Sequence, residues 1–297
     1  MTHTKSVDEF IIYLSKSKNA SQNTLAAYER DLASFEEYAE GFEGGIEGAT
    51  NEDIASYKKH LNKKGFSCSS VSRAMSSVRS YYKYLLQMGI IKDNPTKDIK
   101  NDKPEKKALE VLTADEISLL LDQPDTSDIK GMRDKAMLET MYATGMKVTE
   151  LISLSVSDVN LQLGFIICHG EEALKNERTV YLYPTALNAI KDYLSSSRVV
   201  LANDGEDALF VNIGGARMTR QGFWKILKKY AEQAGIQKTI TPHTIRHSFA
   251  THLLENGADI KEIKEILGHT DIASTQIYAN YIKSKMKDSY LKFLPRT

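Results

Sequence analysis

The chain has 297 residues, with 39 basic and 39 acidic side chains and therefore a formal net charge of zero. This length accommodates two domains of ordinary size. No apolar stretch approaches the roughly 20 residues that a membrane span needs, and the N-terminus lacks the apolar core of a signal peptide. The balanced charge excludes a uniformly basic surface but permits a basic face opposite an acidic one.

The first part of the chain is predicted to be helical. Apolar positions recur at three- and four-residue spacing, as in amphipathic helices, over residues 5–18, 21–41, 51–64 and 68–88. Ser21 or Asn23 is expected to cap the second helix and Asn51 the third, and Gly89 follows the fourth helix as a C-cap.

A polar, lysine-rich segment with two prolines runs from Lys92 to Lys107. This composition is typical of an exposed linker. The sequence therefore predicts a first domain over residues 1–103, a linker over 104–111 and a second domain over 112–297. The alternative is a long surface loop within a single domain.

The second domain is predicted to be helical with a small sheet. Thr113 and Glu116 form a capping-box pattern before its first helix. The runs 164–169 and 178–184 are apolar or alternating and predict a β-hairpin. Helices are expected over residues 114–122, 130–144, 147–154, 185–198, 219–234, 242–256, 259–267, 271–282 and 284–293. The predicted fold class is therefore mainly α, with a small antiparallel sheet.

The two cysteines, Cys68 and Cys168, form no CxxC pattern. They predict reduced thiols in a cytoplasmic protein rather than a disulfide or a zinc site.

The densest cluster of chemically active residues is T-P-H-T-I-R-H-S-F-A-T-H-L-L, residues 241–254. His243 and Arg246 are three residues apart on a predicted helix, so they share a face. Arginine can grip two phosphate oxygens and histidine can exchange a proton near neutral pH, which suits phosphate chemistry. One alternative is a metal site at His243 and His247, although no acidic or cysteine partner stands at a typical spacing. The other is simple packing for His247 and His252.

The segment that follows predicts a helix, a turn and a second helix. Gly268 ends the first helix and His269 falls at the turn. Asp271 can cap the second helix, which carries Tyr278 and Tyr281 three residues apart. Taken alone, both tyrosines would be interpreted as packing residues.

Together these segments resemble the C-terminal signature of tyrosine recombinases: H-T-I-R-H, then L-G-H, then a tyrosine nine residues after His269. Residues 132–151 resemble the first catalytic box of that family, and residues 21–32 and 78–95 resemble its core-binding domain. The resemblance spans nearly the whole chain, and the compact two-domain size is similar to the Xer-type site-specific recombinases. It implies a helical, SAM-like N-terminal domain and an α+β catalytic domain.

The resemblance also implies a reaction. Tyr278 would attack a DNA backbone phosphorus, leaving a 3′-phosphotyrosyl bond and a free 5′-hydroxyl, with no cofactor. Arg246 would bind the non-bridging oxygens, His243 would assist proton transfer at the tyrosine oxygen, and His269 would contact the phosphate. Tyr278 is preferred to Tyr281 because its spacing from His269 matches the family.

The first catalytic box departs from the family pattern. Its A-T-G-x-R-x-x-E-L motif normally holds an arginine where this chain has Lys147. Lysine keeps the charge but loses the two-pronged grip on phosphate. Either a natural divergence or an introduced change that slows the chemistry accounts for Lys147.

The hairpin turn also departs from the pattern. G-E-E-A-L-K-N-E-R, residues 170–178, is two residues longer than the family's G-K-G-x-x-x-R, whose lysine protonates the leaving oxygen. Lys175 is the only lysine of this turn, and it either fills that role or is a solvated turn residue. The sequence therefore predicts an active recombinase. The alternatives are a weakened or inactive relative that binds DNA, and a helical scaffold whose histidines and tyrosines only pack.

DNA-binding residues are predicted in both domains. Arg73, Arg79 and Lys83 share a helix that can enter the major groove. Arg217 and Arg220 stand at a helix start suited to phosphate contacts. For each of these residues, a solvated helix face is the alternative.

The resemblance finally implies partners. It implies double-stranded DNA and a homotetramer on two recombination sites, alone or with a related recombinase, and no membrane or metal partner is expected. Residues 284–297 resemble the tail that packs on a neighbouring subunit, with Leu291, Phe293 and Leu294 as its apolar anchor.

Overall fold

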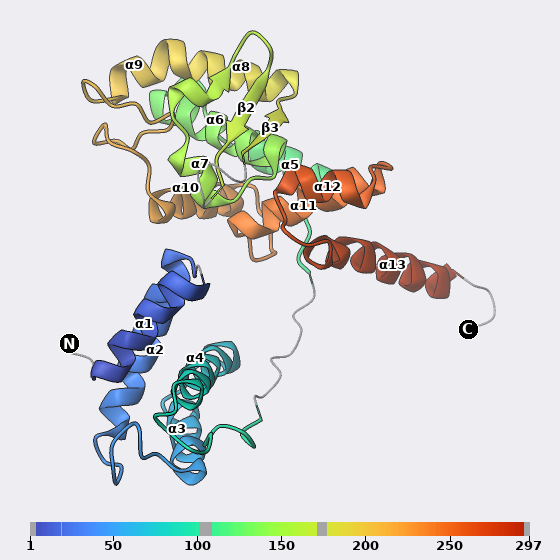
Figure 1. The fold of residues 1–297 in the computed structure, drawn as a ribbon. Coiled ribbons are helices and arrows are strands. Elements are labelled where there is room, and N and C mark those ends of the chain that lie inside the picture. Colours follow the sequence, from blue (N-terminus) through green and yellow to red (C-terminus); the bar gives the residue numbers. More distant parts are fainter. Residues whose placement is uncertain (1–3, 19, 101–108, 171–176, 294–297) are drawn as a thin grey trace. The chain divides into compact units, whose positions relative to one another are not determined.

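The residues that the computed structural model describes are 4–18, 20–100, 109–170 and 177–293 (Figure 1). For residues 288–293 the backbone alone is described. The chain divides into two compact units, Met1–Lys107 and Ala108–Thr297. The predicted linker over 104–111 lies mostly outside the described residues, so its bounds stay a prediction. Among the helices described, none has both the length and the apolar character to cross a bilayer.

The first unit is helical, as predicted, with α1 (Lys5–Lys18), α2 (Gln22–Ala39), α3 (Asn51–Lys63) and α4 (Cys68–Gln87). Ser21 caps α2 by accepting the backbone N–H of Thr24. The prediction of Asn51 as the cap of α3 was wrong by one residue. Thr50 caps that helix because its side chain and that of Asp53 form a reciprocal capping box.

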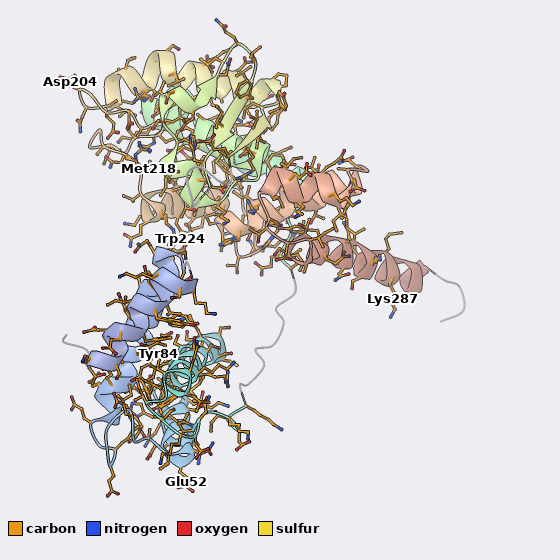
Figure 2. The ribbon with its side chains drawn as sticks, viewed as in Figure 1. Glu52, Tyr84, Asp204, Met218, Trp224 and Lys287 are labelled. Carbon is orange, nitrogen blue, oxygen red and sulfur yellow. The ribbon has the colours of Figure 1, made fainter. Side chains whose placement is uncertain are left out.

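An aromatic core holds the first unit together. The Phe35 ring lies with its centroid 4.8 Å from that of Tyr57 and 6.1 Å from that of Tyr82. Tyr84 lies on α4 (Figure 2). Its ring centroid is 5.3 Å from that of Phe10 of α1. Tyr82 is fully buried and donates its hydroxyl to the carbonyl oxygen of Ile46 at 2.6 Å. It therefore belongs to the core and not to a ligand-facing surface.

The second unit is mainly helical around a small sheet. Its elements in chain order are α5 (Ala114–Leu121), α6 (Ile129–Thr144), α7 (Val148–Ser153), a 3-10 turn (Val156–Asp158), β1 (Val159–Asn160), β2 (Phe165–Cys168), β3 (Arg178–Tyr181), α8 (Pro184–Asp192), a π-helical turn (Tyr193–Ser197), α9 (Arg198–Leu201), α10 (Arg220–Gln233), α11 (Pro242–Glu255), α12 (Ile260–Leu267) and α13 (Ala273–Phe293).

The predicted hairpin is present as β2 and β3, and β1 pairs with β2 on its other side to give an antiparallel sheet. Ile166, Cys168 and Val180 face the core and are buried. Cys168 pairs with Arg178 in the register. Strand β1 was not predicted, because two residues are too few to show an alternating pattern.

Helix α6 passes through the core of this unit, with Met137, Leu138 and Met141 fully buried. Several of its polar residues are buried too, among them Arg133 and Asp134. Arg133 donates to Asp134 at 2.7 and 2.9 Å, and Tyr230 of α10 donates to the other oxygen of that carboxylate at 3.0 Å. Burial raises the pKa of Asp134 although Arg133 acts in the opposite direction.

The prediction of separate helices over 271–282 and 284–293 was wrong. A single helix, α13, runs from Ala273 to Phe293. No glycine or proline stands between the two predicted segments, so the backbone has no reason to break there.

Candidate active site

A glycine turn places the first catalytic box. Helix α6 ends at Gly145, whose φ of 57° is left-handed, and a side chain at this position would overlap the ring of Phe249. The chain then turns so that Lys147 becomes the N-cap of α7. Its backbone N–H donates to the Glu150 carboxylate at 2.8 Å. Lys147 therefore stands where α6 and α7 meet, close enough to His243 and His269 for its charge to act on both.

Arg246, on α11, is the centre of the site. It is only 4% exposed, and it donates from Nη1 to the carbonyl of Gly145 at 2.7 Å and from Nη2 to that of Leu267 at 2.8 Å. Both acceptors are carbonyls at the C-terminal ends of helices, where the backbone is partly negative. These bonds use two of the five guanidinium N–H groups. Burial lowers the pKa of Arg246, but an arginine stays charged at neutral pH.

An ion pair braces the site from the sheet side. Arg178 of β3 makes two hydrogen bonds to Glu150, at 2.7 and 3.1 Å, and its Nε donates to the carbonyl of Ile266 at 2.6 Å. Burial would raise the pKa of Glu150, but the hydrogen bonds and charge of Arg178 outweigh burial and lower it. Gly268 has a φ of 67°, and a Cβ there would lie 2.9 Å from Nη1 of Arg178. The glycine after α12 is therefore required by both conformation and space.

Three histidines lie beside this cationic centre. Burial, followed by the charges of Arg246, Arg220 and Lys147, lowers the pKa of His243. Burial and the neighbouring charges lower the pKa of both His247 and His269 to about 4. All three are therefore predominantly neutral at pH 7. His269 is fixed by a 2.8 Å hydrogen bond between its Nδ1 and the hydroxyl of buried Thr275.

Tyr278 reaches this centre from α13. It is 1% exposed and packs against Phe249, Ala250, Ile263 and Leu267. Its hydroxyl lies 3.1 Å from Nδ1 of His247. Burial raises the pKa of Tyr278, although the charge of Arg246 acts in the opposite direction.

The structure thus brings together most of the predicted catalytic residues. The charge of Arg246 acts on His243, His269 and Tyr278, and the charge of Lys147 acts on the same two histidines. Lys175 lies outside the described residues. Sequence reasoning missed His247, which it assigned to packing, and the pair of Glu150 and Arg178. The sequence motifs contain both members of this pair. Glu150 is the glutamate of the first catalytic box, and Arg178 is the arginine that ends the hairpin turn.

An open cavity of about 430 Å³ adjoins His243. Its other lining residues are Val148, Arg220, Gln221, Trp224 and Pro242. Arg220 and Gln221 come from the first turn of α10, where backbone N–H groups and the helix dipole favour an anion. The cavity therefore continues the positive character of the site outward from His243.

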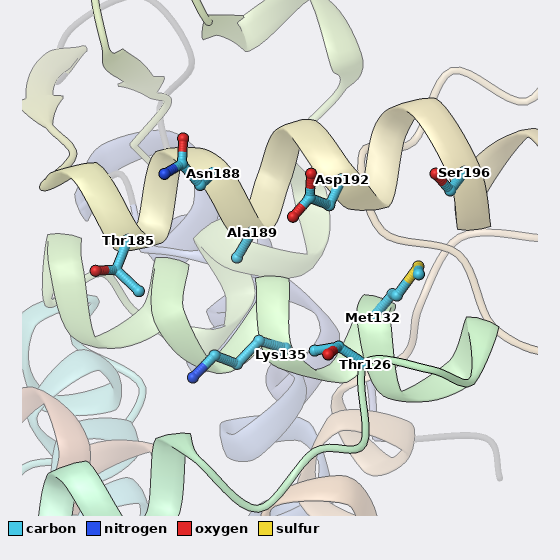
Figure 3. A pocket seen from close by; sticks show the side chains of 8 residues that line it. All are labelled: Thr126, Met132, Lys135, Thr185, Asn188, Ala189, Asp192 and Ser196. Carbon is cyan, nitrogen blue, oxygen red and sulfur yellow. The ribbon is translucent and has the colours of Figure 1, made fainter.

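A second cavity, of about 350 Å³, lies between α6 and α8 (Figure 3). Lys135 is the cation among its lining residues, and it is already paired with Asp122 at 3.1 Å and Glu139 at 2.9 Å. None of the residues that meet around Arg246 lines it. We do not assign it to the active site.

Residues 110–285 match the sequence profile of the phage integrase family, and residues 7–89 match that of the phage integrase N-terminal SAM-like domain. The chain belongs to the phage integrase family. Its curated relatives show that it is a tyrosine recombinase. It is 42% identical over 294 residues to the tyrosine recombinase XerD of Oceanobacillus iheyensis and 44% identical over 294 residues to that of Listeria innocua, with 98% of each chain covered.

Solved structures agree with this membership. The crystal structure of XerA recombinase is 29% identical, with a TM-score of 0.54 over 99% of this chain and 100% of that chain. XerH recombinase bound to a palindromic difH substrate, in a post-cleavage complex, is similar in fold. Its TM-score is 0.76 at 21% identity, covering 97% of this chain and 84% of that chain. The predicted family and fold class are confirmed.

The predicted DNA-binding residues of the first unit differ in their surroundings. The guanidinium of Arg73 pairs with Asp31 at 2.6 Å, and that of Arg79 donates to the carbonyl of Ile99 at 2.8 Å. Lys83 is exposed on α4. None of these observations tests DNA contact, so the three residues stay predictions.

In the recombinase's second unit, Arg217 and Arg220 are held differently. The Arg217 guanidinium donates to the carbonyls of residues 152–154 and to Asp207 at 2.8 Å, so it ties its loop to the end of α7. Arg220 is exposed at the start of α10 and lines the cavity beside His243. Of the two, Arg220 has the surroundings that suit a phosphate.

The lowered histidine pKa values predict a pH dependence of stability. In the unfolded chain a histidine binds its proton near pH 6.5, whereas folded His269 resists it down to about pH 4. Between these values the unfolded state binds more protons than the folded state, so the free energy of unfolding falls as the pH is lowered from 6.5 to 4. The stabilising contribution of the neutral histidine is complete above pH 6.5. His247 and His269 each account for up to about 3 kcal/mol of this change. The free energy of unfolding, measured by urea titration at several pH values, should change less with pH over this range in His269→Asn than in the original chain. An unchanged dependence on pH would contradict the prediction.

Proposed function

We propose that Tyr278 of this recombinase attacks a phosphorus of double-stranded DNA and forms a 3′-phosphotyrosyl bond, without a cofactor. The observation that carries the proposal is the position of the Tyr278 hydroxyl. It lies in a buried site beside Arg246, together with His243, His269 and Lys147. A phosphate in that site would meet positive charge on several sides and a nucleophile on one.

The chemistry assigns each residue a task. As the bond between Tyr278 Oη and phosphorus forms, the phenol proton leaves and the bond from phosphorus to the 5′-oxygen breaks. Arg246, Lys147 and His269 stabilise the negative charge on the non-bridging oxygens. His243 assists proton transfer at the tyrosine oxygen, and Lys175 donates a proton to the departing 5′-oxygen. Attack of a 5′-hydroxyl on the phosphotyrosine reverses the step and rejoins a strand.

DNA contacts outside the site are assigned by charge and by position on a helix. We assign Arg73, Arg79 and Lys83 to contacts made by α4, and Arg220 to the phosphate that flanks the scissile one. Arg217, already bound by carbonyls, shapes its loop and contributes charge. Structural relatives solved as DNA complexes, including XerH on difH and a lambda integrase dimer on a core site, support DNA as the partner.

A nicked suicide substrate tests the proposal. Cleavage beside a nick releases a short fragment, so the covalent adduct accumulates instead of being rejoined. The protein should form an SDS-stable complex with DNA labelled on the 3′-phosphate side, and proteolysis should leave that label on the peptide containing Tyr278. Binding should weaken steeply as salt rises, because phosphate contacts release counterions. Salt-dependent binding without an adduct would favour the alternative of an inactive DNA-binding relative.

We further propose that the recombinase acts on DNA in the cytoplasm as a homotetramer on two sites, alone or with a related recombinase. The tail over residues 284–297 would dock on the neighbouring subunit. Leu291, Phe293 and Leu294 would anchor it, although their side chains lie outside the described residues. Deleting 285–297 should weaken cooperative binding to paired sites while binding to a single site persists, measured by gel shift. Unchanged cooperativity would contradict this assembly.

A further inference from the structure

The hydroxyl of Tyr278 is held by a histidine outside the set that the sequence predicted. The Tyr278 hydroxyl lies 3.1 Å from Nδ1 of His247, and the two atoms form a hydrogen bond. The His247 ring neighbours two others, with centroid distances of 5.6 Å to Tyr278 and 6.3 Å to His243. His247 is therefore a neighbour of both the nucleophile and the histidine assigned to proton transfer.

The surroundings of His247 define what it can do. Burial, then the charges of His243, Arg246 and His269, lower its pKa to about 4. A neutral imidazole with its proton on Nε2 accepts a hydrogen bond at Nδ1. A group this reluctant to become cationic is a weak base toward a phenol, whose pKa is near 10 before burial raises it further. His247 is therefore suited to hold the phenol oxygen and poorly suited to remove its proton.

We propose that His247 is a positioning residue for the nucleophile. Its Nδ1 accepts the O–H of Tyr278 and keeps the phenol oxygen inside the cationic site, in reach of a phosphate on Arg246. This inference rests on the proposed function of Tyr278. It adds a residue to the reaction that carries out no bond-making step of its own.

The same helix provides a matched control. His252 also lies on α11, and its Nδ1 lies 2.9 Å from the hydroxyl of Tyr142. That tyrosine belongs to α6, and the other nitrogen of His252 bonds the carbonyl of Leu112. The two histidines thus make the same kind of contact, one to the nucleophile and one to a structural tyrosine.

The test compares substitutions at both positions on the nicked suicide substrate. Single-turnover adduct formation is measured at saturating protein, with DNA affinity and thermal stability recorded in parallel. His247→Leu should slow adduct formation by on the order of 10²-fold, since a misplacement of about 1 Å at a reacting group can cost that much. DNA affinity should be unchanged. His252→Leu should lower thermal stability and leave the rate at saturation close to that of the original chain.

Two further variants separate positioning from structural support. Asparagine places an amide oxygen near the position of Nδ1, and glutamine places one nearer to Nε2. His247→Asn should therefore recover most of the rate and His247→Gln should not. This comparison holds even if His247→Leu does not fold. Equal rates for Asn and Gln, or a normal rate for Leu, would overturn the proposal.

A DNA substrate with sulfur in place of the bridging 5′-oxygen shows whether His247 acts on the attacking tyrosine or on the leaving group. Its thiolate departs without a proton, so a defect in protonating the leaving group is relieved. The His247→Leu defect should persist on this substrate, whereas a Lys175→Ala defect should shrink. Relief of the His247→Leu defect would overturn the assignment. If the original chain forms no adduct at all, the proposed function of Tyr278 fails instead.

Discussion

Replacing Tyr278 with phenylalanine is expected to abolish the covalent DNA adduct while DNA binding persists. The change removes one oxygen and keeps a ring that fits the same pocket against Phe249 and Leu267. Without that oxygen no ester to phosphorus can form, so the rate should fall by on the order of 10⁴-fold or more. The lost hydrogen bond leaves Nδ1 of His247 without this donor, which costs about 1–3 kcal/mol of stability at most.

The control for this prediction is Tyr281→Phe. Tyr281 follows on the same helix, is half-buried and was the competing candidate for the nucleophile. Suicide-substrate gels of both variants, with gel-shift affinities alongside, decide between them. An adduct formed by Tyr278→Phe and lost in Tyr281→Phe would reverse the assignment.

The electrostatics of the site bear on when Tyr278 reacts. Burial raises its pKa, and Arg246 offsets only part of that increase. The phenol is therefore protonated at neutral pH and is a weak nucleophile before DNA arrives. The proton must leave while the bond to phosphorus forms. In the proposed reaction the hydrogen bond with His247 and the nearby charge of Arg246 would therefore act on the same phenol oxygen.

The sequence predicted the local part of this site well. The spacing of His243 and Arg246 on one helix, and the glycine turn that precedes His269, depend on neighbours three to nine residues away. Helical periodicity and capping rules act over that range. The C-cap at Gly268 and the hydrogen bond of Asp271 to the N–H of Ser274 are both present in the structure.

What the sequence could not predict depends on contacts between distant segments. Glu150 and Arg178 are 28 residues apart and meet only because the hairpin returns β3 to α7. The contact between His247 and Tyr278 spans 31 residues. His243 and His247 are four residues apart on one helix, and the sequence alone does not indicate which of them contacts a later helix. The sequence therefore identified residue types, whereas their pairing required the tertiary fold.

The same distinction applies to Lys147. The sequence shows that lysine replaces the arginine of the family box, and the structure shows where that charge lies. Lys147 is the N-cap of α7, and its charge is felt by both His243 and His269. The lysine at position 147 therefore still contributes positive charge to the site. Lysine is a compact charge with rotatable donors, whereas arginine presents a planar fork that matches two phosphate oxygens.

Lys147→Arg is accordingly expected to speed strand cleavage by on the order of tenfold to a hundredfold, because a second aligned donor would strengthen with the charge developing on phosphate. Lys147→Gln should slow it, since the charge is lost. Both are measured as single-turnover adduct formation at saturating protein, where a change in DNA affinity has no effect. Lys130→Arg, an exposed position on α6, controls for the exchange itself. If Lys147→Arg cleaves no faster while Lys147→Gln is slow, lysine already makes the full contact here, and the departure from the family pattern carries no catalytic cost.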